Sequence, residues 1–284
     1  MIPKSTNRLI DKELKKARAA SLIVGVVSHN DMEVESYLHD YYDGMDPERL
    51  LVEIGSATKT FTGTLLAKLV TDGVIALDDS VCPYVPKFKK ALTYEGKEVT
   101  FRHLATHTAS LPKDDVQTIR QLIKQDATVK LNPFSQYDET HFTEFFQHYQ
   151  PKRAFGTKWV YSNLGISLLG YVLAKVVDMS YEEAIQTYIL NPLCMDDTHF
   201  IVPEEKMNRY VKSYTKKNEP IPPMDIGVFN PAGGLKSSTL DMLKYLRFQM
   251  GLRETSESLA SAMELSQEAQ GIKAMKGFEN ALTW

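Results

Sequence analysis

Apolar residues recur every three or four positions along most of this chain, the spacing of amphipathic helices. Residues 56–71 show it clearly, with Leu65, Leu66 and Leu69 on one face. Residues 203–231 carry five prolines and predict a long surface loop, and the residues after Met250 predict a weak helix and loop. Helices are expected over 8–20, 56–71, 101–107 (ending near Pro112), 115–125, 139–149, 164–177, 180–190 and from Ser238 or Thr239 to about Met250.

A different pattern marks the segment before residue 40. Residues 22–27 and 32–37 predict two strands around His29-Asn30-Asp31, which together form a hairpin. A lone hairpin is barely stable in water. The sheet therefore needs further strands, and the pattern of the chain does not obviously supply them.

Composition narrows the class of protein. The 284 residues are 43% hydrophobic and 24% charged with a net charge of −3, which suits one large globular domain or two smaller ones. Nothing indicates a nucleic-acid surface. No apolar run reaches the ~18 residues of a membrane span. Cys82 and Cys194 show no metal-ligand spacing and are expected to be free thiols.

The N-terminal residues are charged and lack the apolar core of a signal peptide. The expectation is a cytoplasmic chain if the sequence is as encoded, or an exported one if a signal was removed.

Ser56 and Lys59 stand where the helix predicted over 56–71 begins. Positions three apart share a helix face, so the hydroxyl and the amine can meet. A serine needs a base to become a nucleophile, and the unpaired N–H groups of a first turn favour a neutral lysine. Gly55 permits close approach of a substrate carbonyl. The same spacing at Ser110 and Ser213 opens no apolar helix, so the spacing alone is a weak signal.

Two further stretches carry candidate chemistry. Tyr161-Ser162-Asn163 precedes the apolar helix predicted at 164–177, where a phenol can relay a proton and an amide can bind a substrate. The alternative is a helix cap formed by Ser162 or Asn163. Gly233-Gly234 indicates a close backbone approach or a left-handed turn, and the alternative is a helix N-terminal turn.

His103 and His107 lie four residues apart on one predicted helix face. A zinc site needs a third ligand, and the protease form needs Glu after the first histidine, where Leu104 stands. We expect buried, hydrogen-bonded histidines here, with no metal and no cofactor.

Taken in order, S-x-x-K, HLATHT-x-x-LP, Y-S-N and P-A-G-G-L resemble the serine penicillin-recognising enzymes over roughly residues 20–250. The resemblance is closer to the class C β-lactamase branch, which includes D-alanyl-D-alanine carboxypeptidases and esterases. EIGSATKTFTGTLLAKLVTDGVIALDD and RHLATHTASLP are similar to its AmpH-type carboxypeptidase/endopeptidase group.

The resemblance implies a role for each matching residue. Ser56 is the acylated nucleophile, and its backbone N–H forms half of the oxyanion hole. Lys59 activates the serine, Tyr161 shuttles protons, and Asn163 binds the substrate amide. The glycines of these motifs belong to the substrate-binding set: Gly55, Gly233 and Gly234.

The implied fold is α+β, of the β-lactamase/transpeptidase type: an antiparallel sheet with flanking helices beside a large all-helical domain, with the C-terminal strands missing. Residues 1–54 and about 245–284 are expected to form the incomplete sheet domain. Residues 55–244 form the helical domain with the catalytic motifs.

The third motif of that family, K-T-G or H-x-G, is absent from the sequence. ENALTW at 279–284 resembles the start of the strand just before it. The expectation is therefore either a fragment or a shortened, inactive relative. Without those strands the 22–37 hairpin exposes an edge that allows self-association.

The leading hypothesis is a serine hydrolase that forms an acyl-enzyme on D-alanyl-D-alanine peptides or β-lactams. Its partners are then a small molecule or a peptidoglycan peptide, in the periplasm or cell envelope if a signal was removed. The alternatives are a carboxylesterase of the same fold and a non-catalytic binding protein, the latter because the third motif is absent.

Overall fold

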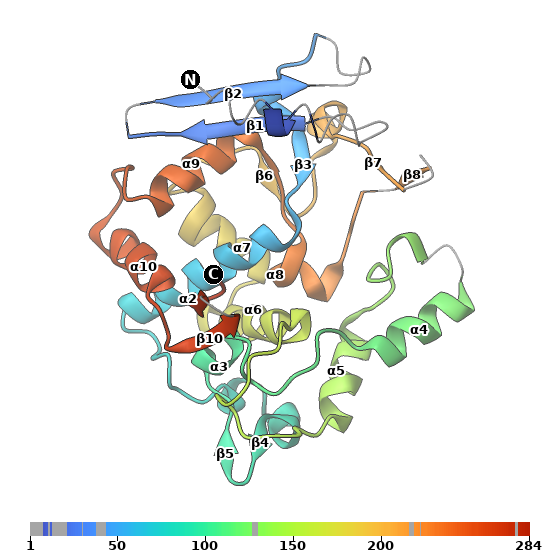
Figure 1. Cartoon of the computed structure of the whole chain (residues 1–284). Helices are drawn as coiled ribbons and strands as arrows, with labels where there is room; N and C mark the ends of the chain where they lie inside the picture. The colour runs from blue at the N-terminus through green and yellow to red at the C-terminus, as the bar shows by residue number, and fades with distance from the viewer. Residues whose placement is uncertain are drawn as a thin grey trace.

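The computed structural model describes residues 8–10, 12, 22–29, 31–37, 44–126, 130–215, 219–221, 223–275 and 278–284. Helices enclose the main core, and short antiparallel sheets lie around them (Figure 1). This mixture confirms the predicted α+β class.

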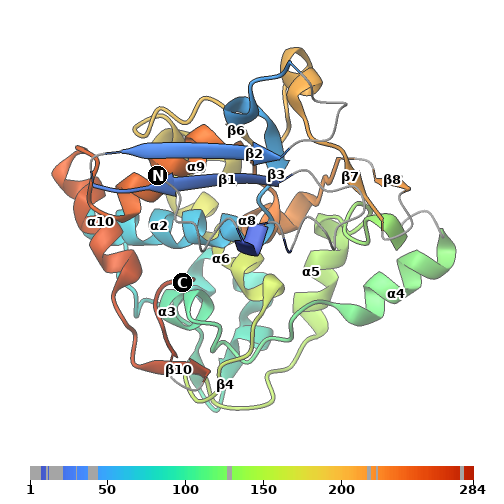
Figure 2. The same ribbon diagram turned by 45° about the horizontal axis from the view of Figure 1, so that its top comes forward.

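The expected hairpin is present. β1 (Leu22–Val27) and β2 (Met32–Tyr37) pair antiparallel over six residue pairs. The hairpin lies across α9 (Thr239–Gln249), as both views show (Figures 1 and 2). Gly25 permits this contact, because a Cβ there would lie 2.9 Å from Cδ2 of Leu243. The helix therefore covers one face of the two-stranded sheet.

A second, three-stranded sheet was not predicted. β9 (Lys236–Ser238) lies between β3 (Leu51–Glu53) and β6 (Thr198–His199), both antiparallel to it. The pairing continues beyond the strand, because Ile54 N–H donates to the carbonyl oxygen of Leu235 at 3.1 Å. It holds the chain just before Ser56 beside the Gly-Gly segment. The division into sheet and helical domains stays a prediction.

The helices predicted from periodicity are largely present, with ends shifted by a few residues. The α-helices, besides α9, are α2 (Thr58–Thr71), α3 (Phe101–Ala105), α4 (Val116–Gln125), α5 (Glu139–His148), α6 (Asn163–Val177), α7 (Tyr181–Ile185), α8 (Asn230–Gly233) and α10 (Glu257–Gln267). A π-helical turn, η7 (Gln186–Leu190), extends α7. The 3-10 turns are η2 (Pro47–Arg49), η3 (Gly55–Ala57), η4 (Cys82–Tyr84), η5 (Pro86–Leu92), η8 (Glu204–Arg209) and η9 (Gly227–Phe229).

Several boundaries differ from the expectation. The α-helix expected over 56–71 begins at Thr58, and Ser56 lies in the 3-10 turn η3. The helix expected over 101–107 ends at Ala105, because His107 adopts a left-handed backbone with φ of 59°. Of the helix expected over 8–20, residues 8–10 and 12 are helical and the rest lies outside the described residues.

Regular structure also appears where loops were expected. The 203–231 segment contains η8, η9 and the hairpin of β7 (Ser213–Tyr214) and β8 (Pro220–Ile221). After Met250, α10 is the weak helix that was expected, and the loop expected there contains the hairpin of β10 (Ile272–Met275) and β11 (Phe278–Asn280). β4 (Thr93–Tyr94) and β5 (Lys97–Glu98) form another hairpin, with strands of two residues each. Such short strands leave almost no alternating pattern to detect in the sequence.

α6 is the central helix of the core, with nine residues buried along its length. Ser162 caps its start by accepting the N–H of Gly165 at 2.9 Å, the capping alternative considered for this segment. None of the described helices is by itself long and apolar enough to cross a membrane, although α6 and α7–η7 together, bent by 78°, have the length and composition.

The last four residues pack against α2. Thr283 donates its N–H to the carbonyl oxygen of Ala105 at 3.0 Å and its hydroxyl to that of Lys59 at 2.7 Å. Gly63 makes room for this segment, since a Cβ there would overlap the carbonyl oxygen of Leu282 and Oγ1 of Thr283. The helix that carries Lys59 is thereby held from its far side.

His107 fixes the segment that leads into α6. Its carbonyl oxygen accepts from Val160 N–H at 2.9 Å, and its Nδ1 accepts from Ser162 N–H at 3.1 Å. The imidazole is 6% exposed, and burial, aided by the charge of Lys59, lowers its pKa from 6.5 to about 4. A neutral imidazole is thus part of the native structure and holds the residues on both sides of Tyr161.

The close packing at Gly63 predicts an unusual substitution effect. Gly→Ala in an open helix normally stabilises by about 1 kcal/mol. Gly63→Ala should instead lower the free energy of unfolding by ~1–3 kcal/mol, because the added methyl group displaces residues 282–283. Urea unfolding followed by circular dichroism measures the change, and a stabilised variant would contradict this packing.

The neutral imidazole predicts a pH-dependent stability. The unfolded chain binds a proton at His107 near pH 6.5 and the native chain only near pH 4, so stability is lost as the pH falls through this window. At pH 5 the loss attributable to His107 should be about 2 kcal/mol relative to pH 7.5. Urea unfolding at both pH values should show a smaller loss in His107→Asn, where Asn tolerates the left-handed backbone. An equal loss in both proteins would refute the assignment.

Candidate active site

The hydroxyl of Ser56 and the amine of Lys59 meet as their spacing predicted. Ser56 is exposed in the turn η3, and Lys59 lies in the first turn of α2. The Nζ of Lys59 donates to the Oγ of Ser56 at 3.2 Å. Gly55, with a φ of +51°, makes the left-handed bend into this turn, a conformation that favours glycine. The local sequence alone therefore places a nucleophile candidate beside an amine.

Burial changes the chemistry of that amine. Lys59 is only 2% exposed, and its Nζ also donates to the carbonyl oxygen of Ala232 in α8. Desolvation by burial lowers the pKa of Lys59 against the raising effects of Tyr161 and Asp114. A lysine with a lowered pKa is more often neutral near physiological pH, which is the form that can accept a proton.

Tyr161 comes from a segment about a hundred residues later and completes the cluster. Its hydroxyl lies 2.8 Å from the Oγ of Ser56, and the Nζ of Lys59 lies 4.9 Å from its ring centroid. The ring centroids of Tyr161 and His107 are 4.9 Å apart, so the neutral imidazole packs against the phenol ring. Two side chains that can carry proton-transfer chemistry, those of Lys59 and Tyr161, thus converge on the hydroxyl of Ser56.

Asn163 lies at the start of α6, two residues after Tyr161. Its Nδ2 donates to Oδ1 of Asp114 at 2.8 Å, and its backbone N–H donates to the carbonyl oxygen of Lys113 at 2.8 Å. Asp114 was missed by the sequence reasoning, although a carboxylate shortly after the HLATHTASLP motif was a visible signal. The amide is oriented by this carboxylate, and its role toward a substrate stays a prediction.

Gly233 and Gly234, which follow Ala232, pack against different neighbours. A Cβ on Gly233 would lie 3.8 Å from the backbone of Gly55, so these two glycines face each other beside Ser56. A Cβ on Gly234 would overlap Oδ1 of Asn230, so packing against α8 accounts for Gly234. Substrate binding by all three glycines stays a prediction.

The two histidines have structural partners. His103 forms a capping box with Thr100 at the start of α3, and His107 accepts the N–H of Ser162. Among the residues that the structure describes, no group of three His, Cys, Asp or Glu could hold a metal ion.

A second buried lysine was not foreseen. Lys236, opposite Glu53 in the β3–β9 pair, is 4% exposed and donates to the carbonyl oxygens of Phe200 and Met224. Burial lowers its pKa, opposed by the charge of Glu53. Glu53 in turn accepts from Met224 N–H at 2.8 Å. These bonds connect the sheet to the segment before α8. The carbonyl oxygen of Ala232 in α8 is the one that accepts from Lys59.

Comparisons with known proteins match this architecture. A family model described as Beta-lactamase matches residues 6–282. A beta-lactamase of Providencia stuartii is 29% identical over 241 residues, 84% of this chain and 56% of that protein. The beta-lactamase-like protein 2 of Dictyostelium discoideum is 30% identical, over 91% of this chain and 47% of that protein. The chain thus spans about half the length of these curated relatives.

Solved structures agree on the fold. A class C beta lactamase from Rhodobacter sphaeroides has a TM-score of 0.80 at 25% identity, covering 99% of this chain and 74% of that one. A beta-lactamase/D-alanine carboxypeptidase from Pseudomonas syringae has a TM-score of 0.81 at 23% identity, covering 98% and 73%, which shows the fold alone. With a family match over nearly its whole length, the chain belongs to the beta-lactamase family.

Proposed function

We propose that this protein is a serine hydrolase that forms an acyl-enzyme at Ser56. The observation that carries the proposal is the position of the Ser56 hydroxyl, which lies 3.2 Å from the Nζ of Lys59 and 2.8 Å from the hydroxyl of Tyr161. Hydrogen-bond contact between a nucleophile and its base is the geometry that serine chemistry needs.

The proposed reaction uses Lys59 and Tyr161 in both of its halves, acylation and hydrolysis of the acyl-enzyme. The Oγ of Ser56 attacks a carbonyl carbon while its proton passes to neutral Lys59. The C–N or C–O bond of the substrate then breaks, and the hydroxyl of Tyr161 protonates the leaving group and regains its proton from Lys59. Water, deprotonated by the same pair, hydrolyses the acyl ester and restores the Ser56 hydroxyl. The exposed position of Ser56 gives a substrate access to this step.

The proposed substrates are D-alanyl-D-alanine peptides or β-lactams. Support comes from the family match and from the class C beta lactamase and D-alanine carboxypeptidase among the structural neighbours. An ester would enter the same chemistry, since the acyl-serine intermediate is shared, so a carboxylesterase is the nearest alternative. Substrate contacts are proposed for Asn163, Gly55, Gly233 and Gly234.

A second candidate is a non-catalytic binding protein that keeps the same cleft but forms no acyl-enzyme. The 284 residues contain neither K-[ST]-G nor H-x-G, the motif that supplies a second oxyanion donor in the enzymes that the sequence resembles. Loss of one oxyanion-hole donor alone lowers turnover by roughly 100- to 1000-fold. The two candidates differ in whether Ser56 becomes covalently modified.

The enzyme predicts a covalent adduct on Ser56. Incubation with a fluorescent penicillin should label the chain, and peptide mapping by mass spectrometry should place the label on Ser56. Ser56→Ala should abolish labelling because the nucleophile is gone, and Lys59→Ala should lower the labelling rate at least about 100-fold because the base is gone.

Ser213→Ala is the matched control, since it removes a serine from a second S-x-x-K spacing that opens no helix. It should label like the parent protein. Labelling that survives Ser56→Ala, or no labelling of folded protein, would reject the hydrolase. Parallel assays with p-nitrophenyl acetate and a D-alanyl-D-alanine peptide separate esterase from peptidase.

A rising limb in the pH profile of acylation should report the ionisation of Lys59. The rate increases with pH as the amine becomes neutral, with a midpoint below the ordinary lysine pKa of 10.5. Tyr161, Asp114, Lys113 and His107 all act on this centre, and Asp114 raises the pKa of Lys59. Asp114→Asn should therefore shift the limb to lower pH.

Asp196→Asn is the matched control, because it removes the same charge at an exposed position that does not act on Lys59. Stopped-flow labelling rates across pH 5–11 measure the rising limb of each variant. An unchanged limb in Asp114→Asn, or the same shift in both variants, would contradict the placement of Asp114.

A further inference from the structure

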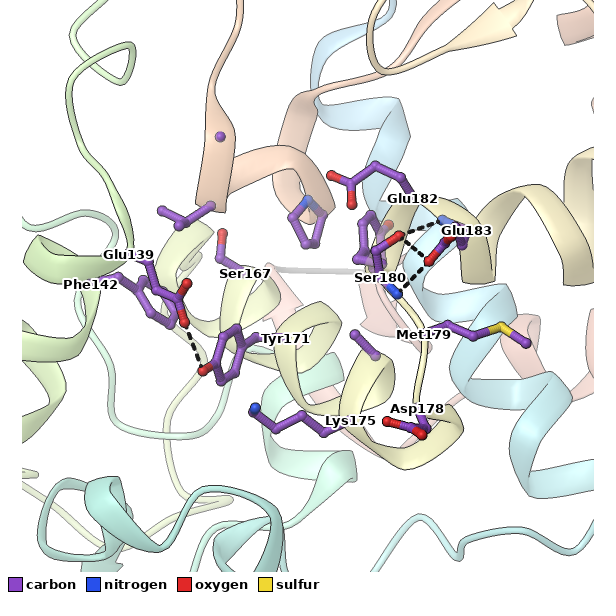
Figure 3. A pocket seen from close by; sticks show the side chains of 15 residues that line it. Glu139, Phe142, Ser167, Tyr171, Lys175, Asp178, Met179, Ser180, Glu182 and Glu183 are labelled. Atoms are coloured by element: carbon purple, nitrogen blue, oxygen red, sulfur yellow. Dashed lines mark hydrogen bonds between the residues drawn. The ribbon is translucent and has the colours of Figure 1, made fainter.

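A cavity of about 600 Å³ lies away from the candidate active site. Its walls come from α5, α6, the start of α7 and the η9–α8 segment (Figure 3). Its size falls within the range of small-molecule sites. Ser56, Lys59 and Tyr161 are not among the residues that line it.

Ser167 provides the first sign of an occupant. It is 0% exposed within α6, and its Oγ has no hydrogen-bond partner among the described residues. Figure 3 shows this hydroxyl directed into the cavity, with Glu139 on one side and Glu182 on the other. A buried hydroxyl without a partner is rare in a native protein, because the lost hydration of the donor is then not replaced by another hydrogen bond. A polar atom of a ligand would complete it.

The charges around the cavity point to a cation. Its lining carries four carboxylates and a single ammonium, that of Lys175, which lies over the ring of Tyr171 at 4.7 Å. Glu182 accepts from Nδ2 of Asn230 at 2.8 Å, and Glu139 accepts from the hydroxyl of Tyr171 at 3.0 Å. One hydrogen bond leaves most acceptor positions of a carboxylate available. The remaining carboxylates are those of Asp178 and Glu183.

Another part of the wall is aromatic and apolar. Phe142, Tyr171 and Tyr181 supply aromatic surface, and Pro231 packs directly on Gly170, where a Cβ would overlap its ring. Aromatic faces accept both the apolar body and the charge of an organic cation. Acidic groups around an aromatic wall suit an amine with an aromatic or aliphatic body better than a free metal ion.

We propose that this cavity is a second binding site, for a small molecule with a protonated amine on an apolar body. The ammonium group lies between Glu139 and Glu182 and donates to the Oγ of Ser167, and the apolar body lies against Phe142 and Tyr171. No acyl transfer is involved, so the site does not depend on the chemistry proposed for Ser56.

The site also has a defined position relative to Ser56. Pro231 lines the cavity, and its carbonyl oxygen accepts from the hydroxyl of Thr62 in α2 at 2.7 Å. The next carbonyl, that of Ala232, accepts from Lys59. α8 therefore contacts both the cavity and the candidate active site, although no side chain of Ser56, Lys59 or Tyr161 lines the cavity.

Calorimetric titration with 2-phenylethylammonium chloride tests the proposal, with phenylacetate as the anion of similar shape. The cation should bind and phenylacetate should bind at least about tenfold more weakly. Glu139→Gln and Glu182→Gln should each weaken binding about five- to tenfold by removing a charge while keeping an acceptor, and Ser167→Ala about fivefold. Circular dichroism confirms that each variant is folded.

Glu264→Gln is the matched control, because this exposed carboxylate in α10 lies outside the cavity lining. It should bind the cation like the parent protein, and so should Ser56→Ala, since the active site is separate. Equal affinity for phenylacetate, unchanged binding in the three cavity variants, lost binding in Ser56→Ala, or no binding up to about 10 mM would each overturn the proposal.

Discussion

The structure of the candidate active site depends on the burial of one amine. Lys59 is 2% exposed, and its Nζ is held between the carbonyl oxygen of Ala232 and the hydroxyl of Ser56. An ammonium group at this position loses most of its hydration, which favours the neutral amine. The same burial that lowers the pKa of Lys59 thus places an amine that can accept a proton beside an exposed serine.

That burial requires several distant segments to pack together. α8 supplies the carbonyl, the C-terminal Thr283 binds the backbone of Lys59 on the other side, and His107 holds the chain that brings Tyr161. The three-stranded sheet fixes the residues before Ser56 next to those before β9. Because the contacts from α8 and from Thr283 are both made to α2, a change that moves this helix is expected to alter the position of Lys59 relative to Ser56.

The sequence predicted what is local and missed what depends on distant contacts. The spacing of Ser56 and Lys59 follows from helical geometry, α6 follows from a long apolar run, and α9 follows from a capping residue at its start. Tyr161 was a candidate from its position before the helix at 164–177, but its pairing with Ser56 followed only from the resemblance of motif order, since nothing local joins the two residues. Short strands such as β6, with two residues, and the pairing of Asn163 with Asp114 arise from tertiary contacts that no periodicity reports. The roles of these residues in substrate binding remain predictions.

The ionisation of Lys59 is the property on which the account depends most directly. NMR titration of protein labelled with ¹⁵N-lysine, with the Lys59 signal assigned by its loss in Lys59→Arg, would measure it in the resting protein. The account predicts a pKa clearly below the ordinary lysine value of 10.5. A pKa at or above that value would show that the amine stays charged, and it would contradict the role of Lys59 as the base for Ser56.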